Sequence, residues 1–280
     1  MTSPDQPGRI FEAVRADGHT QMAIDSHLLQ TISDGPAVRF YQWEGPWLSL
    51  GRNQRTIPNH WHELAAAGEL SLVHRPSGGD AVLHQGGLTY ALIWPEAPRQ
   101  RQQAYRDACR WLIDGFAALG CELQFGQSRA VAGGENCFAR STAADLIDLQ
   151  GNKRIGSAQR WQHGRLLQHG EILLDPPSEL WCKVFREGAP PAAGPEIPRQ
   201  GLDQHLIQTL VQQWNQLAWR RESISADTLR RLTCRSSDWT PDSSSASTPP
   251  AEAASPDPGD KRSASGLPPT SEAANAHPNA

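Results

Sequence analysis

Hydrophobic positions change their spacing several times along the chain, and each spacing predicts a helix or a strand. Apolar residues recur at helical intervals over 20–32, over 104–119 just before Gly120, and over 206–217. Residues 88–94 instead form a nearly continuous apolar run, which is typical of a central strand covered on both faces. The pattern therefore predicts a domain in which helices pack against a sheet.

Shorter apolar segments bounded by Gly, Pro, Asn or Asp predict the other elements. We expect strands at 37–43, 47–51, 70–74, 81–83, 121–125, 145–149, 155–161 and 165–174, and short helices at 61–67 and 226–232. The strand at 47–51 is expected to pair with its predecessor across a Gly45-Pro46 turn, and Gln150 to Lys153 is expected to form a hairpin turn. Helices that alternate with hairpin strands predict the α+β class, with a mixed, largely antiparallel sheet packed with helices.

Composition divides the chain into three parts. Residues 1–18 form a polar lead-in, residues 19–235 hold the predicted elements, and residues 236–280 are rich in Ser, Pro and Ala without any Val or Ile. A chain of 280 residues, 38% of them hydrophobic, suffices for one sizeable core. The last part cannot bury enough apolar surface to offset the entropy of ordering, so we expect one domain followed by a disordered tail.

Charge and cysteine content narrow the function classes. The formal net charge is −4, the pI is about 6.2, and no basic block is present, which argues against nucleic acid as a partner. The polar N-terminus lacks the apolar core of a signal peptide, and no run reaches the roughly 18 apolar residues of a membrane span. The five cysteines include no CxxC pair, which favours free thiols in a reducing cytoplasm over disulfides or a zinc site. Local basic residues such as Arg160, His163 and Arg165 leave an acidic carrier protein open as a partner.

A glycine-bearing turn between two apolar segments is the first candidate binding element. It contains Arg75, Ser77, Gly78 and Gly79, with His84 in the following strand. Glycine permits backbone conformations with positive φ and lets the main chain come close to a ligand. A tight turn without a ligand is the plainer interpretation, but the flanking arginine and apolar strand favour a binding site.

A second stretch offers a nucleophile and a nearby positive charge. Cys137 lies in a loop opened by two glycines, and Lys153 follows after one predicted strand. The thiolate is the nucleophilic form of cysteine, and a neighbouring ammonium lowers the pKa of a thiol from its free value of about 8.5. A buried unreactive cysteine and a solvated lysine are the ordinary alternatives, but the setting favours an acyl-transfer site. The candidate substrate-binding residues that follow are Gly156, Ser157, Ala158, His169 and Gly170. The two histidines could equally do no more than satisfy backbone carbonyls.

These motifs resemble those of one enzyme superfamily. Arg75-Pro76-Ser77-Gly78-Gly79 before Ala81-Val82-Leu83-His84, the segment Lys153 to Ala158, and Gln168-His169-Gly170 before Ile172-Leu173-Leu174 are similar to three motifs of the biotin/lipoate protein ligase superfamily. Asn136-Cys137-Phe138 looks most like the corresponding loop of its cysteine-dependent octanoyltransferases. The resemblance covers about Met22 to Leu217 and implies that residues 19–235 are a catalytic domain of this superfamily.

The resemblance implies a reaction and its partners. An octanoyl group would pass from acyl carrier protein to a lysine of a lipoyl-domain protein, such as glycine cleavage H protein, through an acyl-cysteine intermediate. Cys137 and Lys153 would be catalytic, the two glycine motifs would bind substrate, and no cofactor or metal would be needed. Two alternatives stay open: an ATP- and Mg²⁺-dependent lipoate–protein ligase that forms lipoyl-AMP, and a degenerate domain that only binds a carrier protein. The short segment 200–235 argues mildly against the ligase.

Overall fold

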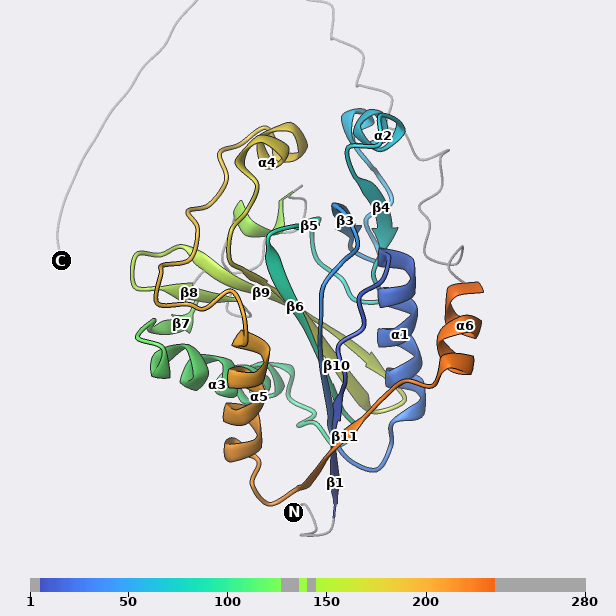
Figure 1. The fold of residues 1–280 in the computed structure, drawn as a ribbon, viewed down its shortest axis with the longest axis vertical. Helices are drawn as coiled ribbons and strands as arrows, with labels where there is room; N and C mark the ends of the chain where they lie inside the picture. The colour runs from blue at the N-terminus through green and yellow to red at the C-terminus, as the bar shows by residue number, and fades with distance from the viewer. Residues whose placement is uncertain (1–5, 127–135, 140–144, 235–280) are drawn as a thin grey trace, which may run out of the picture. The chain divides into compact units, whose positions relative to one another are not determined.

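Two sheets and a set of helices form from residues 6–126, 136–139 and 145–234, which are the residues that the computed structural model describes (Figure 1). The strand order is β11-β1-β2-β6-β10-β9-β8-β7 in the larger sheet and β4-β3-β5 in the smaller one. The strands are β1 (Pro7–Phe11), β2 (Ala37–Tyr41), β3 (Trp47–Leu50), β4 (Ser71–His74), β5 (Val82–His84), β6 (Gly87–Trp94), β7 (Leu123–Phe125), β8 (Leu146–Asp148), β9 (Lys153–Gln162), β10 (Arg165–Leu173) and β11 (Ala218–Glu222). The helices are α1 (Gly18–Thr31), α2 (Asn59–Ala66), α3 (Arg101–Ala118), α4 (Ser178–Phe185), α5 (Leu202–Gln213) and α6 (Ala226–Cys234), with a 3₁₀ turn η1 at Cys137–Ala139.

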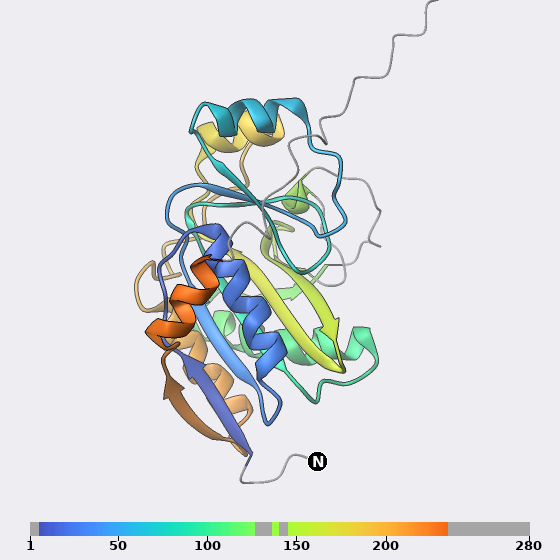
Figure 2. The same cartoon turned by 90° about the vertical axis from the view of Figure 1, so that its right-hand side faces the viewer.

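Helices cover both faces of the larger sheet (Figures 1 and 2). Tyr90 and Leu92 of β6 pack in one hydrophobic cluster with α3 and α5, whereas Ala91 and Ile93 pack in a second cluster with α1. Successive side chains of a strand point to opposite faces, so one strand supplies both clusters. This arrangement confirms the prediction that the apolar run at 88–94 is a central strand covered on both faces.

The smaller sheet, α2 and α4 form a third cluster, which holds the loop of the candidate cysteine. Trp61 of α2 is fully buried there, and its indole nitrogen donates to the Val184 carbonyl of α4 over 2.7 Å. Phe138 of η1 is 6% exposed and packs edge-on against Trp181 in the same cluster. Burial of this phenylalanine fixes η1 against the domain.

The α+β prediction is confirmed, because the sheet is mixed and most of its pairings are antiparallel. The expected pairing of 47–51 with 37–43 is wrong. β2 pairs with β1 and β6, whereas β3 belongs to the smaller sheet and pairs with β4 and β5. Alternation along a strand defines which residues it buries but not its partner, which is chosen by packing of segments distant in sequence.

The N-terminal segment is more structured than its polarity predicts. Residues 7–11, part of the expected lead-in, form β1 and pair in parallel with β2 and β11. Arg9 binds Asp34 over 2.7 Å and Glu222 over 3.3 Å, so ladder hydrogen bonds and charges hold this strand. Neither β11 nor α4 was predicted. The tail expected at 236–280 lies outside the described residues, and within the described ranges no helix is long and apolar enough to cross a membrane.

Candidate active site

A cavity of about 450 Å³, part of it open to solvent, lies where the larger sheet meets the smaller one. Met22, Trp43 and Val82 give it apolar surface. The structure brings nine of the predicted site residues to its wall: Arg75, Gly79, His84, Cys137, Gly156, Ser157, Ala158, His169 and Gly170. Three predicted residues, Ser77, Gly78 and Lys153, do not line the cavity, but Ser77 and Lys153 contact residues that do. The cavity is therefore lined both by the glycine turn with its following strand and by the cysteine stretch, which are far apart in the sequence.

The cysteine and the lysine of the second motif are in direct contact. The Lys153 Nζ lies 3.3 Å from the Cys137 Sγ and donates a second hydrogen bond to the Cys137 carbonyl over 2.6 Å. Cys137 is half-buried at the cavity wall, whereas Lys153 is only 5% exposed. Lys153 was expected in a hairpin turn, but it is the first residue of β9 and points inward. The ammonium is therefore placed to donate a charge-assisted hydrogen bond to the Cys137 sulfur.

Asp145 holds the ammonium in place. Its Oδ1 lies 3.0 Å from the Lys153 Nζ, and both side chains are almost completely buried. A buried ammonium is costly unless an opposite charge and hydrogen bonds compensate it. The Asp145 carboxylate, the Cys137 carbonyl and the Cys137 sulfur all accept from the Lys153 ammonium. These contacts fix the orientation of the ammonium. Before the structure, Asp145 could be recognised only as the first residue of a predicted strand.

Local hydrogen bonds set the position of the sulfur. The Cys137 amide donates to the Ala81 carbonyl over 3.0 Å, and Ala81 pairs with Asn136 as an isolated parallel bridge. The Asn136 side chain accepts from the Phe138 amide over 2.9 Å, which caps the short 3₁₀ turn. The cysteine is thus anchored to the strand that follows the glycine turn.

Arg75 braces the glycine turn from inside. Its guanidinium donates to the carbonyls of Ser49, Gly78 and Asp80 at 2.9, 2.8 and 2.7 Å. Burial lowers the pKa of Arg75, and the nearby Cys137 and Asp80 act in the opposite direction. Because its main hydrogen bonds are made to carbonyls, this arginine shapes the turn, and its expected role in substrate binding remains a prediction.

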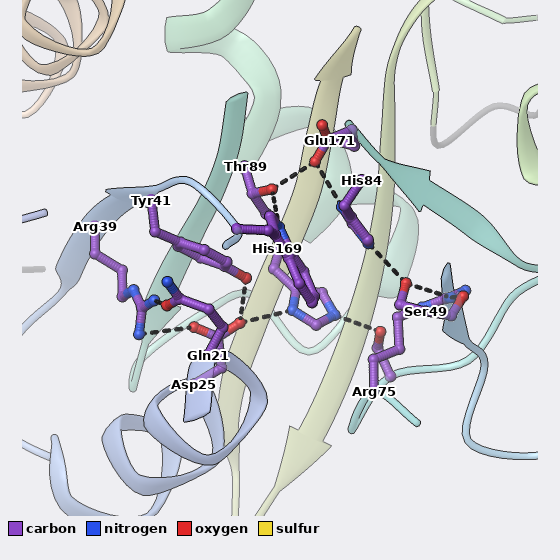
Figure 3. A network of polar contacts seen from close by, with 12 residues as sticks. Gln21, Asp25, Arg39, Tyr41, Ser49, Arg75, His84, Thr89, His169 and Glu171 are labelled. Carbon is purple, nitrogen blue, oxygen red and sulfur yellow. Dashed lines mark hydrogen bonds and ion pairs between the residues drawn. The ribbon is translucent and has the colours of Figure 1, made fainter. Parts of the chain in front are cut away.

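A second buried network reaches the cavity through His84 (Figure 3). The His84 Nδ1 lies 2.8 Å from the Glu171 Oε2, and its Nε2 lies 2.7 Å from the Ser49 Oγ. Thr89 donates to the same carboxylate and accepts from the Trp43 indole over 2.8 Å, while the Trp43 ring stacks on the imidazole. Burial lowers the pKa of His84 more than Glu171 raises it, so the ring is neutral near pH 7. The network assigns the proton to Nδ1, because a carboxylate can only accept.

His169 of β10 has a set of hydrogen-bond partners like that of His84 (Figure 3). Its Nδ1 lies 2.9 Å from the Asp25 Oδ2, and its Nε2 lies 2.5 Å from the Ser77 Oγ. Tyr41 donates to the same carboxylate oxygen over 2.9 Å, and Arg39 lies 3.6 Å from the other. His169 and Glu171 are two residues apart on β10, so both side chains point to the same face. Each histidine therefore joins a serine of the smaller sheet or its turn to a buried carboxylate.

Sequence reasoning missed the carboxylates that orient these side chains. Neither Asp25 nor Glu171 stands in a sequence pattern that marks a carboxylate as the partner of a histidine. A period-two reading of β10 could have placed Glu171 beside His169 on one face, but its partner His84 comes from a different sheet. Among the described residues, no group of three or more His, Cys, Asp or Glu has the geometry of a metal site.

The Lys153 side chain passes close to Gly156, where a larger residue would need the same space. This close approach predicts the effect of adding one methyl group at position 156. A Cβ at position 156 would lie 3.0 Å from the Lys153 Cε and 3.3 Å from the Phe138 ring. We expect Gly156→Ala to displace the ammonium by a few tenths of an ångström and to slow alkylation of Cys137 by iodoacetamide roughly tenfold. Peptide mapping by mass spectrometry at neutral pH measures the rate at this cysteine alone. Gly188→Ala is the control, because its added Cβ meets no atom within 4 Å, and an unchanged rate in Gly156→Ala would contradict the role of the close approach.

Comparisons with known proteins identify a family and several relatives of this chain. Residues 17–191 match the family model of the lipoyl protein ligase A/B catalytic domain. The chain is 36% identical over 179 residues to "Octanoyltransferase LipM" of Lysinibacillus sphaericus, covering 59% of this chain and 64% of that protein. It is 32% identical over 195 residues to "Octanoyltransferase LipM" of Kyrpidia tusciae, covering 65% and 71%. The matches span 64% of the length of the relatives from Lysinibacillus sphaericus and Geobacillus kaustophilus, which is less than two thirds of either protein.

Solved structures share the fold at low sequence identity. The protein Ta0514 of T. acidophilum with bound lipoic acid superposes with a TM-score of 0.68 at 17% identity, over 83% of this chain and 95% of that one. Lipoate-protein ligase A bound with ATP superposes with a TM-score of 0.67 at 16% identity, over 83% and 94%. The family match covers more than half of the chain, and the predicted superfamily resemblance is confirmed: this protein belongs to the lipoyl protein ligase A/B catalytic-domain family.

Proposed function

We propose that this protein is an octanoyltransferase that moves an octanoyl group from a carrier-protein thioester to a lysine of a lipoyl-domain protein. The observation that carries the proposal is the 3.3 Å contact between the Cys137 Sγ and the Lys153 Nζ at the wall of a cavity with apolar surface. The names of the relatives from L. sphaericus and K. tusciae support the same activity. An ATP-dependent ligase has no need of a nucleophilic cysteine, because it activates the acid as an adenylate.

In the first step, the Cys137 thiolate attacks the thioester carbonyl of the donor. The bond between the carbonyl carbon and the sulfur of the carrier arm breaks, the arm leaves as a thiolate that takes up a proton, and the octanoyl group becomes a thioester of Cys137. Lys153 stabilises the thiolate before attack. Amides of the Ser77-Gly78-Gly79 turn and of Gly156-Ser157 are the candidate donors to the oxyanion, and one such donor is typically worth roughly 3 kcal/mol.

In the second step, the amine of the acceptor lysine attacks the acyl-cysteine. An amide forms, the carbon–sulfur bond breaks, and Cys137 returns to its starting form. A thioester is already activated, so neither ATP nor Mg²⁺ is required and we propose that the reaction uses no cofactor. The octanoyl chain would lie along Met22, Trp43 and Val82, whose apolar surface excludes water from the reacting carbonyl.

The two histidine networks would shape this cavity and hold its polar wall. His84 and His169 each present an imidazole whose outer nitrogen is already bound by a serine hydroxyl, so neither leaves an unsatisfied polar atom against the acyl chain.

We propose acyl carrier protein as donor and an apo lipoyl-domain protein, such as glycine cleavage H protein, as acceptor. A cytoplasmic location agrees with the free cysteines of the described residues.

Intact-mass spectrometry after mixing with octanoyl-carrier protein tests the proposed reaction. We expect a mass increase of one octanoyl group without ATP, mapped to Cys137, and loss of the adduct when an apo lipoyl domain is added. The matched experiment supplies lipoate, ATP and Mg²⁺ and measures pyrophosphate release. Pyrophosphate release without any cysteine adduct would replace the proposal with the ligase, and neither signal would indicate a binding domain.

A further inference from the structure

A cleft that the proposed reaction does not use opens on the other side of the glycine turn. It encloses about 860 Å³ of empty space and is lined by Arg52, Arg101 and Arg160 together with the rings of Tyr105 and Trp161. We call it the arginine cleft. The three arginines come from the loop after β3, the first turn of α3, and β9. Residues from three separate elements thus converge on one hollow.

The arginine cleft carries positive charge without a carboxylate in its wall, as far as the structure describes the chain. Among the described residues, no carboxylate lines the cleft, and no ion pair joins Arg52, Arg101 or Arg160 to an acidic side chain. Partial burial lowers the pKa of Arg160, and the like charge of Arg52 lowers it further. Three guanidinium groups held near one another without a carboxylate favour the binding of an anion, and the planar fork of arginine suits phosphate.

The arginine cleft and the acyl cavity are both bordered by the glycine turn. Pro76 and Gly78 of the glycine turn line the cleft, while Arg75 and Gly79 of the same turn line the acyl cavity. Burial raises the pKa of Tyr105, and the nearby Cys109, Asp145 and Cys137 raise it further, which places this ring close to the candidate nucleophile. An elongated ligand with its thioester at Cys137 therefore has a path along the turn into the cleft.

We propose that the arginine cleft binds the phosphate group of the donor's thioester arm. The inference rests on the proposed transferase function, in which the donor is a carrier protein whose acyl group is attached through a phosphopantetheine arm. The octanoyl end occupies the apolar cavity, the thioester reaches Cys137, and the phosphate meets Arg52, Arg101 and Arg160. A hollow with aromatic walls fits a narrow arm better than a flat protein face, which would lie across its rim.

Two soluble donors that differ only in the phosphate test this assignment. Octanoyl-phosphopantetheine and octanoyl-pantetheine each react with the full-length protein, and the rate of acylation at Cys137 is followed by mass spectrometry. The triple variant Arg52→Gln, Arg101→Gln and Arg160→Gln is expected to raise the KM for the phosphorylated donor roughly tenfold or more, since charge-assisted contacts are lost. The donor without phosphate should react within about twofold of the wild-type rate, and Arg110→Gln on the exposed face of α3 is the matched control.

A direct binding measurement separates failure of this inference from failure of the proposed function. Isothermal titration with unacylated phosphopantetheine should give tighter binding than pantetheine to wild type and equal binding to the triple variant. Equal binding to wild type would overturn the inference even if no donor acylated Cys137. If only octanoyl-carrier protein were sensitive to the triple variant, the cleft would contact the acidic face of the carrier, and the phosphate assignment would be wrong.

Discussion

Cys137→Ser is expected to lower octanoyl transfer by roughly a thousand-fold or more, because an alcohol is far less ionised and less nucleophilic than a thiol in the same position. Serine fills nearly the same volume, so the half-buried site and the fold should be unchanged. The rate of transfer to an apo lipoyl domain and the acyl adduct at position 137 are measured together. Both should disappear in the variant.

Cys182→Ser is the matched control for adventitious acylation. Cys182 lies on α4 and is exposed, so any non-specific thioester exchange should reach it. The control should keep full transfer activity and the adduct at Cys137. Full activity in Cys137→Ser would show that the thiol is not the nucleophile and would leave the adenylate-forming reaction as the alternative.

Lys153→Met is expected to reduce both activity and stability, for separable reasons. Without the ammonium, nothing in this contact favours the thiolate, and acylation of Cys137 should slow by roughly a hundred-fold to a thousand-fold. The Asp145 carboxylate would also remain buried without its ion pair, which typically costs about 3–5 kcal/mol in the free energy of unfolding. Denaturant titration measures the second effect, and single-turnover acylation measures the first.

The double variant Lys153→Met and Asp145→Asn separates the two effects. A neutral amide at position 145 removes the uncompensated charge, so most of the lost stability should return while acylation stays slow. Recovery of acylation along with stability would mean that Lys153 acts only by keeping the site folded. Lys183→Met is the control, since its ion pairs with Glu69 and Glu179 lie at the surface and neither measurement should change.

Local patterns were sufficient for most helices and strands of this protein. The apolar run at 88–94 and the helical repeat at 104–119 correspond to β6 and α3, since a buried strand and an amphipathic helix each require their own spacing of apolar residues. The glycine turn and the Lys153 to Ala158 segment were also recognisable, because a close backbone approach restricts which residues fit. The strand β1 escaped detection, because its only large apolar residues are the adjacent Ile10 and Phe11, which show no strand spacing even though both are buried in the core.

The sequence by itself determined the fold class, the family resemblance and the choice of Cys137 and Lys153 as a pair. Only the tertiary structure decided that their Sγ and Nζ atoms are 3.3 Å apart, that Asp145 fixes the amine, and that Asp25 and Glu171 orient the two histidines. It also decided which arginines share a cleft. The physical reason is that propensity and periodicity act over a few neighbouring residues, whereas ion pairs and cavity walls join side chains from distant segments whose meeting depends on the packing of the whole domain.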